Sequence, residues 1–273
     1  MRASCATIFG PAVLLLILPQ AALAAPALVP HRAVYDLKLE QASDRSGIKG
    51  VDGRMVYEFD GSTCDGYTVN FRFVTEISTS ETSRISDLQT STYEDGAGDH
   101  FSFVTKSYVD QKLDREIKGS ATRDAGGVAV DLDKPEKRNL VLDRSQFPTE
   151  HLLELIDHAE KANTFYETTI FDGSEDADRI MTTTVIIGRK SAVPAGDPET
   201  SAVGPLSNEQ FWPVDIAYFD LSEENGEEVP SYRISFKLHE SGVTRDILMD
   251  YGDFSLTGQL VQLDMLPVQE CSR

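Results

Sequence analysis

The sequence predicts a mainly β protein built on one large antiparallel sheet, and three observations support this prediction. Apolar and polar residues alternate through most of the chain. Short segments rich in Gly, Asp and Asn, residues that tolerate tight turns, separate the alternating stretches. Strands and helices do not alternate along the chain, which argues against a parallel sheet.

The stretch from Tyr67 to Ile77 shows the alternation most clearly. Tyr67, Val69, Phe71, Phe73 and Ile77 fall on one face, and polar residues fall on the other. The other predicted strands are 31–41, 54–60, 82–93, 100–109, 115–123, 127–132, 138–143, 163–171, 179–188, 214–221, 231–239, 244–251 and 258–266. A sheet of about fourteen strands must curl, close or split.

One main helix is predicted at about residues 149–162. Pro148 and Glu150 suit a first helical turn, because proline needs no hydrogen-bond acceptor there and an acidic side chain complements the helix dipole. Leu152, Leu153, Leu155, Ile156 and Ala159 follow at helical spacing. A single helix among many strands is typical of a cover or plug for an open sheet.

Residues 191–209 carry three prolines and little periodicity, which predicts a long surface loop. A linker between two domains is the alternative. The predicted strands on both sides have the same character, so we expect one domain over residues 25–273.

The N-terminus has the features of a secretory signal peptide over residues 1–24. Arg2 precedes an apolar run from Ile8 to Leu18, and the small residues Ala22 and Ala24 suit cleavage after Ala24. A buried N-terminal helix or a retained anchor is the alternative. Export would place the mature chain in the periplasm, and no later segment is apolar enough to cross a membrane.

The charge balance limits the partners. The formal net charge of the chain is −20, and loss of Arg2 with the signal peptide makes it −21. Such a field repels nucleic acid and anionic head groups, so we expect neither as a partner. We expect the mature protein to be a monomer.

Signal cleavage also removes Cys5 and leaves Cys64 and Cys271. Two cysteines in an oxidising compartment predict a disulfide, with two free buried thiols as the alternative. The bond would close a loop of roughly 200 residues, for which chain entropy gives about 5 kcal/mol as an upper figure.

Three patterns that resemble catalytic or metal sites are incomplete. Ser46 and Lys49 match the SxxK of penicillin-recognising enzymes, but glycines place them in a turn and no partner motif follows. Asp172, Ser174, Asp176 and Asp178 alternate as in a calcium loop, but Ala177 and Thr183 stand where Gly and Glu are needed. His151, Glu154 and His158 lie one helical turn apart, a spacing that can hold a metal but more often stabilises an exposed helix face. We therefore predict no catalytic residue, no metal and no cofactor.

The single Trp lies in an aromatic segment. Phe211, Trp212 and Tyr218 are candidates for one wall of an apolar ligand cavity, which a wide curled sheet can enclose. Ordinary core packing is the alternative.

Several motifs occur in a recognisable order along the chain. They are His31-Arg32-Ala33-Val34-Tyr35-Asp36-Leu37, Cys64-Asp65-Gly66-Tyr67, Phe147-Pro148-Thr149-Glu150-His151, Trp212-Pro213-Val214-Asp215, Asp250-Tyr251-Gly252-Asp253-Phe254 and the closing Cys271. Together they resemble the EipB family of periplasmic cell-envelope integrity proteins of alphaproteobacteria.

The resemblance implies a single β-spiral, which is an incompletely closed antiparallel sheet around a cavity. It also implies a Cys64–Cys271 disulfide and a shape similar to that of periplasmic lipid and lipoprotein carriers. No catalytic activity is established for the family, so no active-site residue carries over.

The resulting hypothesis is a non-enzymatic periplasmic protein that supports envelope integrity and stress resistance. It would act by binding an envelope lipid, a lipoprotein or a periplasmic protein partner. One alternative is a hydrolase acting on peptidoglycan or another envelope component, with a buried Ser–His or carboxylate pair in its cavity. Another is a scaffold whose outer face recognises a helical-repeat partner.

Overall fold

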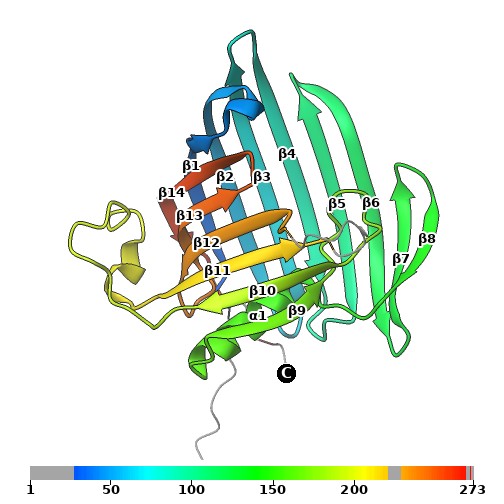
Figure 1. Cartoon of the computed structure of the whole chain (residues 1–273). Coiled ribbons are helices and arrows are strands. Elements are labelled where there is room, and N and C mark those ends of the chain that lie inside the picture. The colour runs from blue at the N-terminus through cyan, green and yellow to red at the C-terminus, as the bar shows by residue number, and fades with distance from the viewer. Residues whose placement is uncertain (1–27, 221–228, 269–270, 272–273) are drawn as a thin grey trace, which may run out of the picture.

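The computed structural model describes residues 28–220, 229–268 and 271. Fourteen antiparallel strands form one curled sheet, as the alternation predicted (Figure 1). The strands are β1 (His31–Ala42), β2 (Ile48–Ser62), β3 (Gly66–Thr79), β4 (Ser83–Glu94), β5 (His100–Val109), β6 (Lys112–Asp124), β7 (Gly127–Lys134), β8 (Arg138–Leu142), β9 (Phe165–Ile170), β10 (Met181–Ile187), β11 (Trp212–Phe219), β12 (Tyr232–Leu238), β13 (Thr244–Asp250) and β14 (Phe254–Met265). The helix α1 (Pro148–Glu160) lies between β8 and β9 in the chain.

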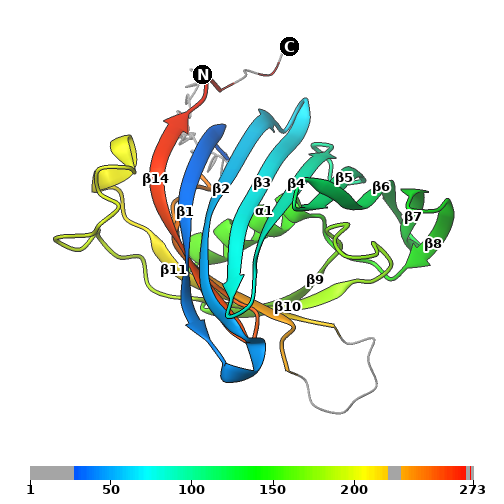
Figure 2. The same cartoon turned by 90° about the horizontal axis from the view of Figure 1, so that it is seen from above.

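The order of the strands explains the curled shape. The sheet runs β8-β7-β6-β5-β4-β3-β2-β1-β14-β13-β12-β11-β10-β9, so the first and last strands pair in its middle. β8 and β9 are the two edge strands of the sheet. An isolated parallel bridge joins Gln146, in the segment after β8, to Ile170 at the end of β9. Seen from above, the sheet curves around α1 (Figure 2). The sheet is therefore an unclosed barrel.

The helix begins one residue before the predicted start and ends at Glu160. Phe147 at its N-cap makes no side-chain capping hydrogen bond. Glu94, from the end of β4, supplies the cap instead: its carboxylate accepts hydrogen bonds from the backbone N–H groups of Thr149 (2.7 Å) and Glu150 (2.9 Å). A carboxylate is favourable there because it complements the helix dipole. The cap fixes α1 to the sheet.

Two hydrophobic clusters form the core. The larger one joins α1 to residues of β1–β3 and β10–β14. The smaller one lies under β5–β7, where Phe101, Phe103, Phe147 and Phe171 pack as stacked and edge-to-face rings. Gly173 follows Phe171 with φ +68°, and a Cβ there would lie 2.7 Å from the ring of Phe103. Glycine at position 173 therefore lets the connection between β9 and β10 pass close to the Phe103 ring.

The segment 191–209 joins β10 to β11, as predicted, but it is more than a surface loop. Its residues Asp197 and Glu199 are buried, and both contact Arg245 of β13, which has no exposed surface. Glu199 Oε1 also accepts hydrogen bonds from the backbone N–H groups of Asp246 (3.1 Å) and Leu260 (2.6 Å). The described pairing of β13 with β14 stops at Ile247. The Glu199 carboxylate thus accepts the backbone hydrogen bonds of β13 and β14 at the point where these two strands no longer pair with each other.

The predicted disulfide is confirmed. Cys64 lies in the turn between β2 and β3, and Cys271 lies beyond β14. Their Cα atoms are 5.7 Å apart, and 207 positions separate them in sequence. The bond ties the C-terminal segment to an early hairpin. The predicted signal peptide lies outside the described residues.

Candidate functional site

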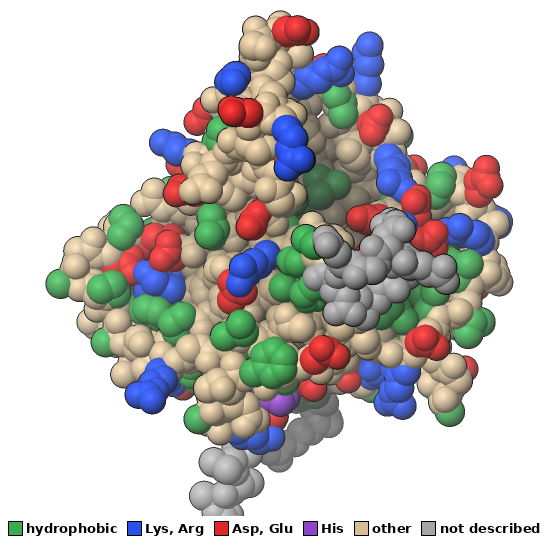
Figure 3. Space-filling view, in the orientation of Figure 1, with side chains coloured by type: hydrophobic (Ala, Val, Ile, Leu, Met, Phe, Trp, Pro, Cys, Tyr) green, Lys and Arg blue, Asp and Glu red, His purple; other side chains and the backbone are tan. Residues whose placement is uncertain are grey.

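An apolar cavity of about 640 Å³ opens inside the curl of the sheet. Figure 3 shows a hollow with hydrophobic side chains in it, in the region of the long hairpins. The cavity is lined by Val51, Met55, Phe71, Phe73, Thr75, Ile77, Ser86, Leu88, Ser107, Asp172, Ser174, Tyr232, Ile234, Ile247, Met249, Tyr251, Phe254 and Leu256. Its size is typical of small-molecule sites, which measure about 300–1,000 Å³.

The lining follows from strand periodicity. Phe71, Phe73 and Ile77 are alternate residues of β3, so their side chains point to the same face. β12 and β13 contribute Ile234, Ile247 and others from the far side of the curl. Phe71, Phe73 and Ile77 pack against the larger core cluster but are only half-buried. The cavity therefore leaves apolar surface in water, and covering it is favourable.

A row of aromatic rings borders the cavity. Ring centroids are 5.6 Å apart for Tyr218 and Tyr232, 5.0 Å for Tyr232 and Tyr251, and 4.9 Å for Tyr251 and Phe254. These spacings are those of ordinary aromatic contacts. The rings of Tyr232, Tyr251 and Phe254 line the cavity itself.

Besides the phenol groups of Tyr232 and Tyr251, the polar side chains of the cavity are four aliphatic hydroxyls and one carboxylate. The hydroxyls belong to Thr75, Ser86, Ser107 and Ser174, and the carboxylate to Asp172. Asp172 Oδ1 accepts a hydrogen bond from the backbone N–H of Ser174 (2.8 Å), which orients the carboxylate. Within the described part of the chain, no Lys, Arg or His lines the cavity.

None of the three residues predicted for a cavity wall belongs to the lining of this cavity. Phe211 packs against Arg245 and His239. Trp212 is a core residue with the Lys190 ammonium 4.3 Å from its ring centre. Tyr218 packs against the ring of Tyr232, which lines the cavity. A role of these three in ligand binding stays a prediction.

The incomplete SxxK and calcium-loop patterns have structural partners. Ser46 Oγ donates a hydrogen bond to the backbone carbonyl of Ser43 (2.8 Å) within a 3₁₀ turn, Asp44–Ser46. Asp176 forms an ion pair with Arg115, and Asp178 forms one with Arg138. These acidic side chains fasten the β9–β10 connection to β6 and β8.

The helix positions one turn apart do not converge. His151 is buried, with its Nε2 3.1 Å from Thr183 Oγ1, and burial lowers the pKa of His151 to about 4. Glu154 accepts a hydrogen bond from Gln146, and His158 stacks on Tyr166 at 4.1 Å. Among the described residues, no cluster of three or more possible metal ligands occurs.

Two histidines make hydroxyl–imidazole contacts that bear on the hydrolase alternative. One is the buried contact of His151 with Thr183. Another joins His100 Nε2 to Ser102 Oγ (3.1 Å), on the face of β5 opposite Phe101 and Phe103. Neither histidine lines the cavity.

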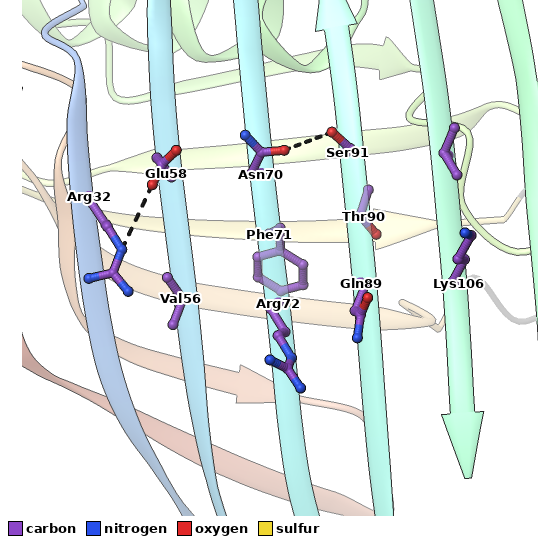
Figure 4. Close-up of a pocket in the computed structure, with 11 residues that line it drawn as sticks. Arg32, Val56, Glu58, Asn70, Phe71, Arg72, Gln89, Thr90, Ser91 and Lys106 are labelled. Atoms are coloured by element: carbon purple, nitrogen blue, oxygen red, sulfur yellow. Dashed lines mark hydrogen bonds and ion pairs between the residues drawn. The ribbon is translucent and has the colours of Figure 1, made fainter. Parts of the chain in front are cut away.

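The outer face carries a second hollow of about 500 Å³ across β1–β5 (Figure 4). Its cations are already paired. Arg32 lies near Glu58 and Asp264, Arg72 binds Asp87, and Lys106 lies 3.8 Å from Glu116. A solvated polar sheet face accounts for this groove.

Comparison with known proteins assigns the family. The EipB-like family model matches residues 22–267. The chain belongs to the EipB-like family. Over 239 residues it is 53% identical to the cell envelope integrity protein EipB of Brucella abortus. The alignment covers 87% of this chain and 84% of that protein. A crystal structure of a beta-barrel-like protein of a domain of unknown function, also from Brucella abortus, superposes with a TM-score of 0.86 at 52% identity, over 89% of this chain and all of that one.

The resemblance inferred from the motifs is therefore confirmed, as is the unclosed β architecture. Within the described residues, no helix is long and apolar enough to cross a membrane.

Sequence reasoning missed most of the cavity residues. They are spread over the inner faces of many strands, and their shared signal was the alternation itself. The buried group of Arg245, Asp197 and Glu199 was also missed, since two of its members lie in a proline-rich segment that reads as solvent-exposed.

Proposed function

We propose that this protein supports cell-envelope integrity in the periplasm as a binding protein without catalytic activity. Its open cavity would receive the apolar part of an envelope lipid or of a lipoprotein. One observation carries the proposal: a cavity of about 640 Å³, part of whose apolar lining, including Phe71, Phe73 and Leu88, is left half-exposed. Membership of the EipB-like family supports the role in the envelope.

The chemistry of the lining favours binding over catalysis. Its hydroxyls have no imidazole or lysine beside them within the described cavity wall, so no serine or threonine there is paired with the bases that commonly activate such a nucleophile. Apolar side chains dominate instead, and burial of apolar surface stabilises a complex by roughly 25 cal/mol per Å² before the costs of association.

The first test measures binding of a neutral apolar dye, N-phenyl-1-naphthylamine, to delipidated protein. We expect its fluorescence to rise on binding to the wild type. Leu88→Glu places a charge in the cavity lining and should weaken binding at least about tenfold, because a buried unpaired carboxylate is costly.

Val141→Glu is the matched control. Val141 is an apolar residue of β8 that is 77% exposed and does not line the cavity. Dye binding should survive this change. If Leu88→Glu bound the dye as well as Val141→Glu did, the cavity would not be the binding site.

The second test asks whether binding matters in the cell. In a strain that lacks the protein, the wild type and Val141→Glu should restore resistance to detergent, whereas Leu88→Glu at equal abundance should not. Full rescue by Leu88→Glu would separate envelope integrity from the cavity. Mass spectrometry of lipids that copurify from the native periplasm would then identify a natural ligand.

A further inference from the structure

The described lining of the cavity contains an acidic side chain but no basic one. Asp172 is the one acidic residue among the lining residues of the described chain, and none of them is Lys, Arg or His. Its carboxylate is held in place by the backbone N–H of Ser174. A carboxylate, sulfate or phosphate on a ligand would find hydroxyl donors but no cation, and Asp172 would repel it. Bringing an anion out of water without a counter-charge is costly.

The aromatic row favours the opposite charge. Tyr232, Tyr251 and Phe254 present rings to the cavity, and Tyr218 continues the row. Asp172 lines the same cavity as the rings of Tyr232 and Tyr251. Burial and, after it, the charge of Asp172 raise the pKa of Tyr218. The faces of aromatic rings attract ammonium groups, more strongly when water is excluded.

We infer that the cavity selects amphiphiles whose apolar chain carries an ammonium group. The chain lies against side chains such as Phe73, Leu88 and Met249, and the ammonium lies between the aromatic row and Asp172. This inference rests on the proposed function and adds the charge class of the ligand. It predicts a preference for amine-bearing lipids over lipids with a purely anionic head.

A series with one chain and three heads tests the inference. Dodecyltrimethylammonium, dodecyl maltoside and dodecanoate are titrated into the full mature chain by calorimetry, each below its micelle concentration. The ammonium should bind about five- to tenfold more tightly than the maltoside, as expected for a partly desolvated cation–π site, and dodecanoate should bind most weakly.

The net charge of the chain requires a control, because a strongly acidic protein attracts any cation. Asp172→Asn and Asp131→Asn each remove one negative charge. Asp131 is exposed on β7 and does not line the cavity, and Asn at 172 keeps an oxygen that can accept from Ser174. The preference for ammonium should fall below about twofold in Asp172→Asn and persist in Asp131→Asn.

A second variant isolates the rings. Tyr251 is 39% exposed, so Tyr251→Leu should leave the fold intact. We expect it to reduce ammonium affinity while maltoside affinity stays within about twofold, because Leu keeps an apolar surface but offers no ring face.

The outcomes separate the two claims. If the three amphiphiles bind equally, or if the ammonium preference survives both Asp172→Asn and Tyr251→Leu, the inference is wrong and the proposed function stands. If none of the three binds, the proposed function fails as well.

Discussion

Replacement of Arg245 by Met should be among the most destabilising single changes in this chain. Arg245 has no exposed surface, and its Nη1 donates to Asp197 Oδ2 at 2.8 Å and to Glu199 Oε2 at 3.1 Å. Its Nε donates to His239 Nε2 at 3.1 Å. Burial raises the pKa of Asp197, but hydrogen bonds from Arg245, Lys237 and the backbone outweigh burial and hold that pKa at about 2. Asp197 is therefore ionised at neutral pH.

The expected cost follows from the charge left behind. Arg245→Met keeps much of the side-chain volume but leaves the buried carboxylate of Asp197 with Lys237 as its remaining cationic partner, beside the backbone N–H of Glu199. Breaking a buried ion pair from one side typically costs 3–5 kcal/mol, so we expect about that loss in the free energy of unfolding. For a chain of this size, that corresponds to a fall in Tm of roughly 6–20 °C.

Urea unfolding at pH 7 measures the loss directly. Limited proteolysis should also show faster cleavage within residues 191–209, because Arg245 anchors that segment. Arg233→Met is the control: Arg233 is 51% exposed and pairs with Asp215 at 2.9 Å, so its removal should cost about 0–1 kcal/mol. The double variant Arg245→Met/Asp197→Asn should cost less than the sum of its two single changes. A cost for Arg245→Met no larger than for Arg233→Met would refute this account of the cluster.

Three further predictions concern the Cys64–Cys271 disulfide, the Glu94 cap of α1 and the contact between Gly173 and Phe103. Cys64→Ser and Cys271→Ser should each lower stability by the same amount, up to about 5 kcal/mol, and the double variant should be no worse; additive losses in urea unfolding would mean that the thiols are not partners. Burial raises the pKa of Glu94 to about 6 from 4.5, so its contribution to stability is present below pH 4.5 and lost as pH rises through 6. Glu94→Gln should therefore gain about 2 kcal/mol relative to wild type between pH 4.5 and 7.5, and an unchanged difference would contradict the shift. Gly173→Ala should cost about 1–3 kcal/mol by thermal unfolding, because φ is +68° and the new Cβ would meet Phe103; a stabilised variant would contradict both reasons.

Local patterns predicted the strands well because each strand has its own alternation. The segments expected at 67–77 and 100–109 correspond to β3 and β5, and the predicted helix differs from α1 by two residues or fewer at each end. The disulfide also followed from counting cysteines, since cleavage of the predicted signal peptide would leave two. These features depend on few residues, and no knowledge of distant contacts is needed.

The cavity and the buried cluster depend on distant contacts, so no local pattern could place them. Phe73 and Met249 are far apart in sequence and share a cavity only because β1 pairs with β14 in the middle of the sheet. Phe211 and Trp212 attracted attention as a dense aromatic segment, but density indicates burial, and both are buried. In the sequence, Arg245 looks like an ordinary surface arginine on a strand. Its burial depends on contacts with Asp197 and Glu199, which lie almost 50 residues earlier in the chain.

The unclosed sheet itself explains why an apolar cavity survives inside a stable protein. A sheet of fourteen strands closed edge to edge would enclose its interior, whereas here β8 and β9 stay apart as edges. One helix and a cluster of Phe rings fill part of the interior, and Phe73 and its neighbours on β3 pack against the larger core cluster but stay partly exposed. Collapse onto that surface would require the long hairpins to bend. The strand ladders, the disulfide and the Glu199 carboxylate between β13 and β14 all resist such bending. The apolar lining therefore stays available to a ligand because the covalent and polar contacts around it hold the curl open.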